Sequence, residues 1–279
     1  MLTGLSLLAS LSVFAAQTTG GEPGDLEETV CGAIKEPFVF AVWSLAAGRP
    51  RPDAAATVAG ATVEAFSHRT RDGRTLRGYR LRADRPVAPR GFILVAQGNA
   101  MLADQLLDAL APFTSALHVV HVLDFRGYGN SEGRRRLKAI VSDYREIFAA
   151  LRADYPGEAL LYGISFGGIV LSNVIGAGAR FDRAVIDSSP SRLSPYGCPE
   201  RYDPVNNLPP DASRMLIVRG EKDRVVPAAD SRELAEVARL RGAQVVTSPD
   251  FGHPFMDTDA AIHARRQNLI RSFLLDGAR

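Results

Sequence analysis

The fold of this chain is decided by the stretch Ala159-Leu160-Leu161-Tyr162-Gly163-Ile164-Ser165-Phe166-Gly167-Gly168-Ile169-Val170. One apolar run leads into a Gly-x-Ser-x-Gly pentapeptide, and a second apolar run with helical spacing leads out of it. This pattern predicts a buried strand, a tight bend that carries Ser165, and a helix. Gly163 and Gly167 are expected where a Cβ would block the backbone. The pentapeptide alone is weak evidence for chemistry, because glycine-rich helix starts also serve packing.

Apolar runs and helical patterns alternate along the rest of the chain. Largely apolar runs, typical of buried strands, cover 91–96, 118–123, 181–187, 215–219 and 244–247. Helical patterns cover 102–110, 140–153, 231–241 and 260–275. Segments 61–66 and 76–81 alternate around Asp72-Gly73, which predicts an antiparallel hairpin. The sequence therefore predicts the α/β class: a mostly parallel central sheet, an antiparallel N-terminal hairpin and helices on both faces.

The composition is that of an ordinary globular protein. Of 279 residues, 46% are hydrophobic and 23% are charged, enough for one large domain with a substantial core. Lysine and arginine number 33 and aspartate and glutamate 31, so the net charge of +2 argues against a nucleic-acid partner. His118 and His121 are expected on opposite faces of one strand, which argues against a metal site. We expect neither a metal nor an organic cofactor.

The first 16 residues are uncharged and largely apolar, and a polar, glycine-rich stretch follows them. Val13 and Ala15 fit cleavage after Ala15, so we predict that 1–16 is a signal peptide and that the protein is exported, either periplasmic or secreted. No Lys or Arg precedes the apolar run, which leaves an uncleaved membrane anchor as the alternative.

Residues 17–60 are predicted to form a linker and an N-terminal apolar segment, and 61–279 the main domain. The segment 34–45 is expected to be helical and either packs on the domain or lies loosely on a membrane. Packing is favoured because the segment is short and lacks a basic face. Cys31 and Cys198 either form a disulfide or remain unpaired, and the sequence does not decide between the two.

Polar residues suited to catalysis follow four of the predicted strands. These are Asn99, Ser165, Asp223 and His253. Ligands of an open parallel sheet gather beyond the carboxyl ends of its strands, so we expect these residues to meet. The order serine, aspartate, histidine is one of three common orders of the serine hydrolase triad. Asp187, at the end of another strand, is a rival for the role of the acid.

Nucleophilic attack by a serine explains why these residue types are needed together. The hydroxyl is a poor nucleophile at neutral pH, so His253 has to take its proton and return it to the leaving group. Asp223 is expected to orient the imidazole and to stabilise the imidazolium that forms. The negative oxygen of the tetrahedral intermediate needs two N–H donors, and the backbone of Phe166 and Asn99 can supply them, each worth about 3 kcal/mol.

A family resemblance rests on five segments: Ala96-Gln97-Gly98-Asn99-Ala100, 124–133, 163–168, 220–227 and Gly252-His253. Together they resemble the α/β-hydrolase superfamily, specifically its small lidless esterase or serine-aminopeptidase-like branch. The resemblance spans about 61–275 and implies that fold. The family usually carries histidine at the position of Gln97, although glutamine can still brace the loop. The resemblance also implies a structural role for the loop 126–129.

These features predict a serine hydrolase that cleaves an ester, thioester or amide bond through an acyl-enzyme, with a carboxylesterase-like activity and a small-molecule or lipid-like acyl substrate. A peptidase of the aminopeptidase-like branch is one alternative. A catalytically silent envelope or binding protein with the same fold is another. The proline-rich segment 188–211 is expected to be a short irregular excursion in place of a lid.

Overall fold

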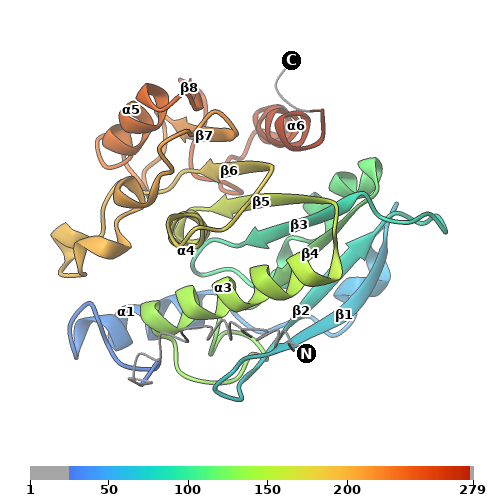
Figure 1. Cartoon of the computed structure of the whole chain (residues 1–279), viewed down its shortest axis with the longest axis horizontal. Helices are drawn as coiled ribbons and strands as arrows, with labels where there is room; N and C mark the ends of the chain where they lie inside the picture. The colour runs from blue at the N-terminus through green and yellow to red at the C-terminus, as the bar shows by residue number, and fades with distance from the viewer. Residues whose placement is uncertain (1–24, 277–279) are drawn as a thin grey trace, which may run out of the picture.

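A computed structural model of the protein describes residues 25–276. One eight-stranded sheet forms its centre, with the strand order β1-β2-β4-β3-β5-β6-β7-β8 (Figure 1). The strands are β1 (Thr62–Arg69), β2 (Thr75–Arg82), β3 (Gly91–Ala96), β4 (His118–Leu123), β5 (Glu158–Ile164), β6 (Arg183–Asp187), β7 (Met215–Gly220) and β8 (Gln244–Ser248). β2 pairs antiparallel with β1 and β4, and the other neighbours pair in parallel. The predicted fold class is confirmed.

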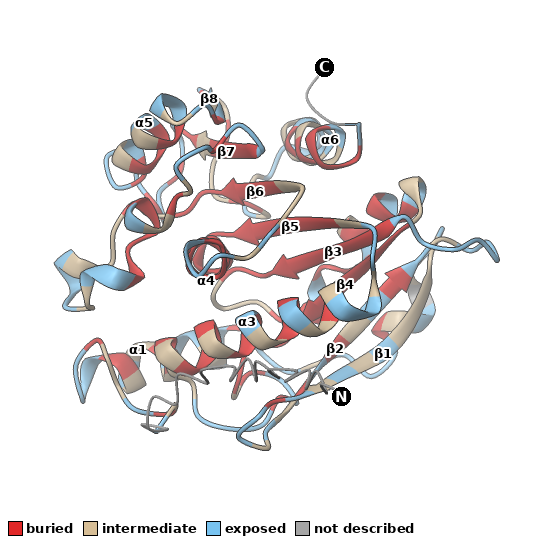
Figure 2. Ribbon diagram, in the orientation of Figure 1, coloured by how far each residue is buried: buried red, intermediate tan, exposed pale blue. Residues whose placement is uncertain are grey.

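Helices cover both faces of the sheet. One apolar core lies against α1 (Lys35–Ala46), α3 (Leu137–Asp154), α4 (Phe166–Gly176) and α5 (Arg232–Leu240). A second core lies on the opposite face, against α6 (Ala260–Asp276) and the short helices between β3 and β4. All residues of β3 and β4 are therefore buried (Figure 2). This packing explains why the central strands read as unbroken apolar runs.

The helix predicted over 102–110 is broken in the structure. Three short helices replace it: η2 (Ala103–Gln105), α2 (Leu107–Leu110) and η3 (Ala111–Ala116), of which η2 and η3 are 3-10 helices. The buried Asp124 accepts the N–H of Ala103 at 2.7 Å, so a tertiary contact shapes the first turn. Pro112 has no N–H for an α-helical bond, which favours the change to 3-10 geometry after α2.

The segment before the sheet is fastened to the domain. A disulfide joins Cys31 to Cys198, 167 residues apart in the sequence. This bond decides the alternative that the sequence left open, and a cross-link over so long a loop typically stabilises a fold by about 2–4 kcal/mol. The buried carboxylate of Glu36 on α1 also accepts the N–H of Leu137 at 2.9 Å, at the start of α3. The helix α1 is therefore held at its N-terminal end by both covalent and polar contacts.

Arg126 anchors the loop after β4 from inside the molecule. Its side chain is fully buried, and the guanidinium binds the carboxylates of Asp143, Asp72 and Glu27. The hydrogen bonds from Arg126 lower the pKa of Asp72 to about 2. A buried cation is tolerated only with such partners, so this loop is built for structure. The cluster joins the tip of the β1–β2 hairpin, α3 and the segment before α1.

The connection between β6 and β7 contains no long helix. Its regular parts are three short 3-10 helices: η4 (Ser194–Tyr196), η5 (Glu200–Tyr202) and η6 (Pro204–Asn207). The buried Asp203 organises it, because its carboxylate accepts the N–H of Leu193 at 2.6 Å and that of Ser194 at 2.8 Å. The connection is therefore an ordered excursion rather than a helical lid.

The predicted signal peptide, residues 1–16, lies outside the described residues. Within 25–276, no helix is both long and apolar enough to cross a membrane. The prediction of export therefore remains a prediction.

Candidate active site

Ser165 lies where β5 turns into α4. Its backbone has φ 53° and ψ −114°, a conformation that is rare for a residue with a side chain. The Ser165 N–H donates to the carbonyl oxygen of Asp187 at 2.7 Å, which ties the bend to the end of β6. Backbone strain of this kind persists only where the surroundings enforce it, and it clusters at functional sites.

The glycines around Ser165 are explained by close packing of the backbone. A Cβ on Gly167 would lie 1.9 Å from the carbonyl oxygen of Ala96 at the end of β3. A Cβ on Gly163 would lie 2.7 Å from the Cα of Gly168. Larger residues at either position would push α4 away from the sheet. The prediction that these glycines make room for the bend is confirmed.

Asp223 and His253 meet at the carboxyl edge of the sheet. His253 Nδ1 lies 2.9 Å from Asp223 Oδ2, and the other carboxylate oxygen accepts the N–H groups of Val225 and Val226 at 2.9 and 2.8 Å. Burial alone would raise the pKa of Asp223, but the hydrogen bonds from His253 and Val226 outweigh it and lower that pKa. The carboxylate is therefore ionised at neutral pH and faces one nitrogen of the imidazole.

The loop after β3 borders Ser165. A Cβ on Gly98 would lie 3.7 Å from the Cβ of Ser165, so the backbone just before Asn99 passes beside the serine. The side-chain oxygen of Asn99 accepts a hydrogen bond of 2.5 Å from the Tyr128 hydroxyl. Tyr128 therefore gives the loop 126–129 a second role, because it holds the loop that carries Asn99.

Two buried amide groups in this loop lack partners among the described residues. They are the side-chain NH₂ groups of Gln97 and Asn99. The oxygen of Gln97 makes only a long contact, 3.4 Å, with the Tyr144 hydroxyl, so this glutamine braces the loop weakly. Buried donors are normally satisfied, so these two amide groups are candidates for contact with a bound water, ion or substrate.

Asp187, the rival acid, has a different partner. Its carboxylate is fully buried, and Oδ1 lies 3.7 Å from Nε of Arg266 on α6. Burial raises the pKa of Asp187 to about 6, although the charges of Arg266 and His253 oppose this. Of the two carboxylates, Asp223 is the one in hydrogen-bond contact with His253.

Arg266 anchors the loop that carries His253. No sequence motif predicts this role. The fully buried guanidinium donates to the carbonyl oxygen of Gly252 at 2.8 Å and lies 3.3 Å from Asp257 Oδ2. The other oxygen of Asp257 accepts the N–H of Gly252 at 2.8 Å. The guanidinium carbon also lies 4.4 Å from the centroid of the Phe251 ring. These contacts fix the backbone on the N-terminal side of His253.

Replacing Arg266 by methionine is expected to lower the free energy of unfolding by about 3–5 kcal/mol, since it leaves the carboxylates of Asp187 and Asp257 buried without their cation. Arg265→Met is the matched control, because Arg265 is 55% exposed and pairs with Asp250 at the surface. Arg265→Met should lower the free energy of unfolding by less than about 1 kcal/mol. Urea unfolding of both variants measures the difference, and equal losses would contradict the anchoring role.

The two histidines of β4 contact different side chains. His118 Nε2 lies 2.9 Å from Glu158, and His121 Nε2 lies 3.3 Å from the Tyr155 hydroxyl. In residues 25–276 no group of three or more histidine, cysteine, aspartate or glutamate side chains is arranged to hold a metal.

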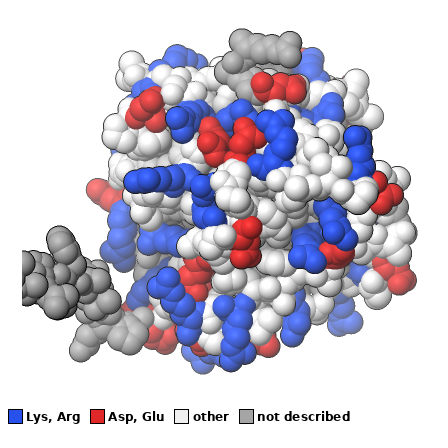
Figure 3. Space-filling model, turned by 45° about the vertical axis from the view of Figure 1, so that its right-hand side comes forward, with Lys and Arg blue, Asp and Glu red and all other residues white. Residues whose placement is uncertain are grey.

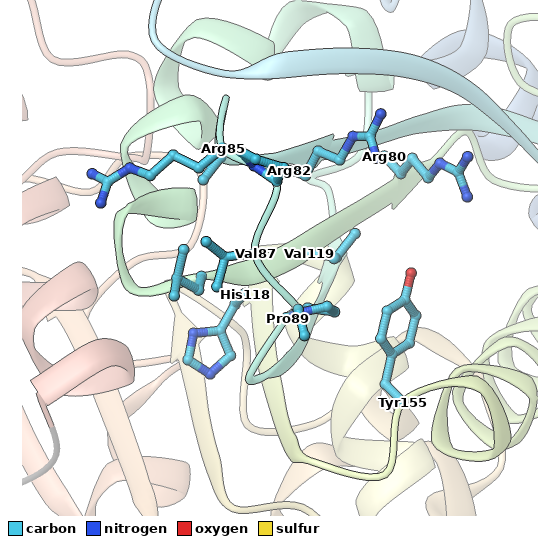
Figure 4. A pocket seen from close by; sticks show the side chains of 12 residues that line it. Arg80, Arg82, Arg85, Val87, Pro89, His118, Val119 and Tyr155 are labelled. Atoms are coloured by element: carbon cyan, nitrogen blue, oxygen red, sulfur yellow. The ribbon is translucent and has the colours of Figure 1, made fainter.

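A pocket of about 400 Å³ lies at the opposite end of the strands from Ser165, where the parallel strands β3 and β4 begin. It is lined by the end of β2, the start of β4 and the segment before β3, whereas Ser165 follows the carboxyl end of β5. Figure 4 shows Arg80, Arg82 and Arg85 along one side and Tyr155 on the other. Arg80 and Arg82 share one acidic partner, Glu64, and Figure 3 shows acidic side chains interspersed among basic ones on one face of the molecule. This pocket is separate from the candidate active site.

Comparison with known proteins agrees with this architecture. Residues 87–203 match the family model described as "Serine aminopeptidase, S33", and residues 194–279 match the model described as "TAP-like protein". The chain has the α/β-hydrolase fold. Ser165 lies within the first matched region, and Asp223 and His253 lie within the second.

Solved α/β-hydrolases share the fold at low sequence identity. An esterase of Pyrococcus furiosus superposes with a TM-score of 0.63 at 16% identity, covering 81% of this chain and 95% of that one. A serine hydrolase without lid from Xanthomonas campestris superposes with a TM-score of 0.59 at 20% identity, covering 77% and 93%. A monoacylglycerol lipase of Mycolicibacterium smegmatis is 22% identical over 59% of this chain and 81% of its own length. The predicted resemblance is confirmed.

Proposed function

We propose that this protein is a serine hydrolase that cleaves esters through an acyl-enzyme formed on Ser165. Two observations carry the proposal: the hydrogen bond between His253 Nδ1 and Asp223, and the strained strand-to-helix bend at Ser165. With Nδ1 bound to the carboxylate, Nε2 of His253 is free to take the proton of Ser165. The hydroxyl oxygen then attacks the carbonyl carbon, and His253 returns the proton to the leaving alcohol.

The tetrahedral intermediate needs donors for its negative oxygen. The N–H of Phe166 begins α4, where an α-helix has no internal acceptor for it, and Asn99 lies on the loop that borders Ser165. In this proposal these two N–H groups bind the oxygen, as the sequence predicted. Water then repeats the attack on the acyl-enzyme, with His253 acting first as base and then as acid.

An aminopeptidase activity is the second candidate, because the matched family model is described as a serine aminopeptidase. Such an enzyme needs an anionic group that binds the free amine of its substrate. Asp187 does not serve, since its carboxylate is buried and faces Arg266. We therefore favour the ester as substrate.

A panel of aryl esters of rising acyl length, run beside aminoacyl-arylamides, tests this choice. We expect turnover of the esters and at least about a hundredfold lower kcat/KM on the arylamides, a difference of about 2.7 kcal/mol in transition-state stabilisation. Faster hydrolysis of the arylamides than of the esters would contradict the esterase proposal and favour an aminopeptidase. Absence of turnover on every compound, despite labelling by a fluorophosphonate, would favour the catalytically silent alternative.

A further inference from the structure

The helix α1 has two apolar faces, and only one of them packs on the protein. Phe40 on the helix and Ala47, directly after its end, are buried against the domain. The opposite face carries a stripe at helical spacing that is open to solvent: Ile34, Phe38, Val42 and Leu45, which are 85, 67, 46 and 80% exposed. From Ile34 to Leu45, eleven steps of about 1.5 Å each, the stripe is about 16 Å long. We call these four residues the outer stripe.

The anchors of α1 keep the outer stripe turned away from the domain. At the N-terminal end the disulfide Cys31–Cys198 and the hydrogen bonds of Glu36 hold the helix. At the other end the carbonyl oxygen of Ala47 accepts a 2.8 Å hydrogen bond from the side chain of Gln105. A helix fixed at both ends cannot roll to bury its outer face, so water or a partner has to cover the stripe.

We propose that the outer stripe docks on the surface of a phospholipid bilayer. A flat row of large aliphatic and aromatic side chains suits the boundary between headgroups and acyl chains. Lys35 and Arg49 flank the stripe and are exposed, whereas Arg51 is paired with Asp104, and Glu36, the acidic residue of α1, is buried. The flanks therefore attract anionic headgroups.

The neighbouring connection adds a second feature typical of the membrane interface. Tyr196 is 50% exposed, its ring lies 5.7 Å from the Lys35 ammonium, and Lys35 also donates to the Tyr196 carbonyl oxygen at 2.7 Å. Tyrosine and lysine side chains combine an apolar body with a polar tip, so both suit the headgroup level.

Pairing of two copies through α1 is disfavoured by the same charges. An antiparallel pair of α1 helices would bring Lys35 of one copy close to Arg49 of the other. These like charges would repel each other at both ends of the stripe. Anionic lipid removes this repulsion, which is why we commit to the bilayer.

Docking by α1 places the candidate active site next to the membrane. The Phe40 ring on the inner face lies 5.5 Å from the ring of Phe166, the residue directly after Ser165. A helix is about 10–12 Å across, so α1 alone lies between the docked surface and the ring of Phe166. If the proposed hydrolase activity holds, its substrate class is an acyl lipid presented by a bilayer. Docking itself does not depend on that activity.

The chain provides its own probe, because Trp43 on α1 is its single tryptophan. The full-length protein is mixed with vesicles of phosphatidylcholine and phosphatidylglycerol, and tryptophan emission is recorded. We expect a blue shift, and quenching when the phosphatidylcholine carries brominated acyl chains. Both effects should weaken on vesicles of phosphatidylcholine alone. Unchanged emission with every vesicle would overturn the proposal.

Matched variants separate the outer stripe from other apolar residues. The triple variant Ile34→Ser, Phe38→Ser, Leu45→Ser should lower the partition into vesicles at least about tenfold, because partition scales with the apolar area that is buried. The control Val87→Ser, Leu240→Ser alters residues that are 55 and 87% exposed elsewhere and should partition like the wild type. If the triple variant does not fold, Phe38→Ser alone should still weaken binding about threefold.

The same variants give further tests of the proposal. Equal partition of the triple variant and the wild type would overturn the proposal, and so would a stripe-dependent dimer that does not bind vesicles. Hydrolysis of a soluble aryl ester should be unchanged in the triple variant, while hydrolysis of an ester embedded in vesicles should fall. If no ester is cleaved but Trp43 still responds to vesicles, the proposed activity fails and the docking surface stands.

Discussion

Replacing Ser165 by alanine is expected to lower kcat/KM on an aryl ester by on the order of 10⁶-fold, because no other group takes over as nucleophile. Labelling by a fluorophosphonate should disappear as well, since that reagent bonds to the activated serine oxygen. The fold should be retained, because alanine keeps the Cβ and the backbone of the strained bend is unchanged. Steady-state kinetics and gel-based labelling measure the two effects.

Ser172→Ala is the matched control for that variant. Ser172 lies on the same helix, α4, and is also buried, and its hydroxyl has no hydrogen-bond partner among the described residues. Its loss should leave activity within about twofold of the wild type, since no interaction is removed. Equal labelling of the wild type and Ser165→Ala would contradict the assignment of Ser165 as the nucleophile.

Replacing Asp223 by asparagine is expected to lower kcat/KM by about 10⁴-fold. The asparagine side chain keeps the size of the carboxylate but carries no charge. It therefore no longer stabilises the imidazolium of His253, and its NH₂ group favours the wrong tautomer. Because hydrogen bonds hold the pKa of Asp223 below its ordinary value, the wild-type carboxylate stays ionised through the neutral pH range. The loss should therefore be similar at each pH between 6 and about 9.

Asp187→Asn provides the comparison that decides which carboxylate acts on His253. Asp187 faces Arg266, and neither of its carboxylate oxygens has a hydrogen-bond partner among residues 25–276, so replacing it should reduce kcat/KM much less than replacing Asp223. A larger loss of kcat/KM in Asp187→Asn than in Asp223→Asn would instead assign the acid of the triad to Asp187.

Much of this fold follows from local patterns. Apolar runs such as the one before Ser165 predict buried strands, because a strand covered on both faces has no polar side. The glycines around Ser165 predict the bend, because only a residue without a Cβ fits so close to Ala96. The helix over 102–110 is the exception, since a contact from Asp124, 21 residues further along the chain, helps to shape its first turn.

The candidate site was only partly predictable. Ser165, Asp223 and His253 are recognisable because residue type, order and position after strands are all properties of the sequence. Arg266 and Asp257 are not recognisable, because an arginine in a polar helix has no signal that distinguishes a buried anchor from a surface charge. The neighbouring Arg265 and Arg266 look alike in sequence, yet one is 55% exposed and the other fully buried.

The sequence by itself determined the α/β class, the bend at Ser165 and the candidate set of reactive residues, because these depend on side-chain chemistry and on periodicity over short stretches. Only the tertiary structure decided that Asp223 rather than Asp187 bonds to His253, and that Cys31 reaches Cys198. It also decided that α1 packs through Phe40 while its outer stripe faces solvent. Each of these facts is a distance between residues far apart in the chain, and such distances arise only when the elements pack together.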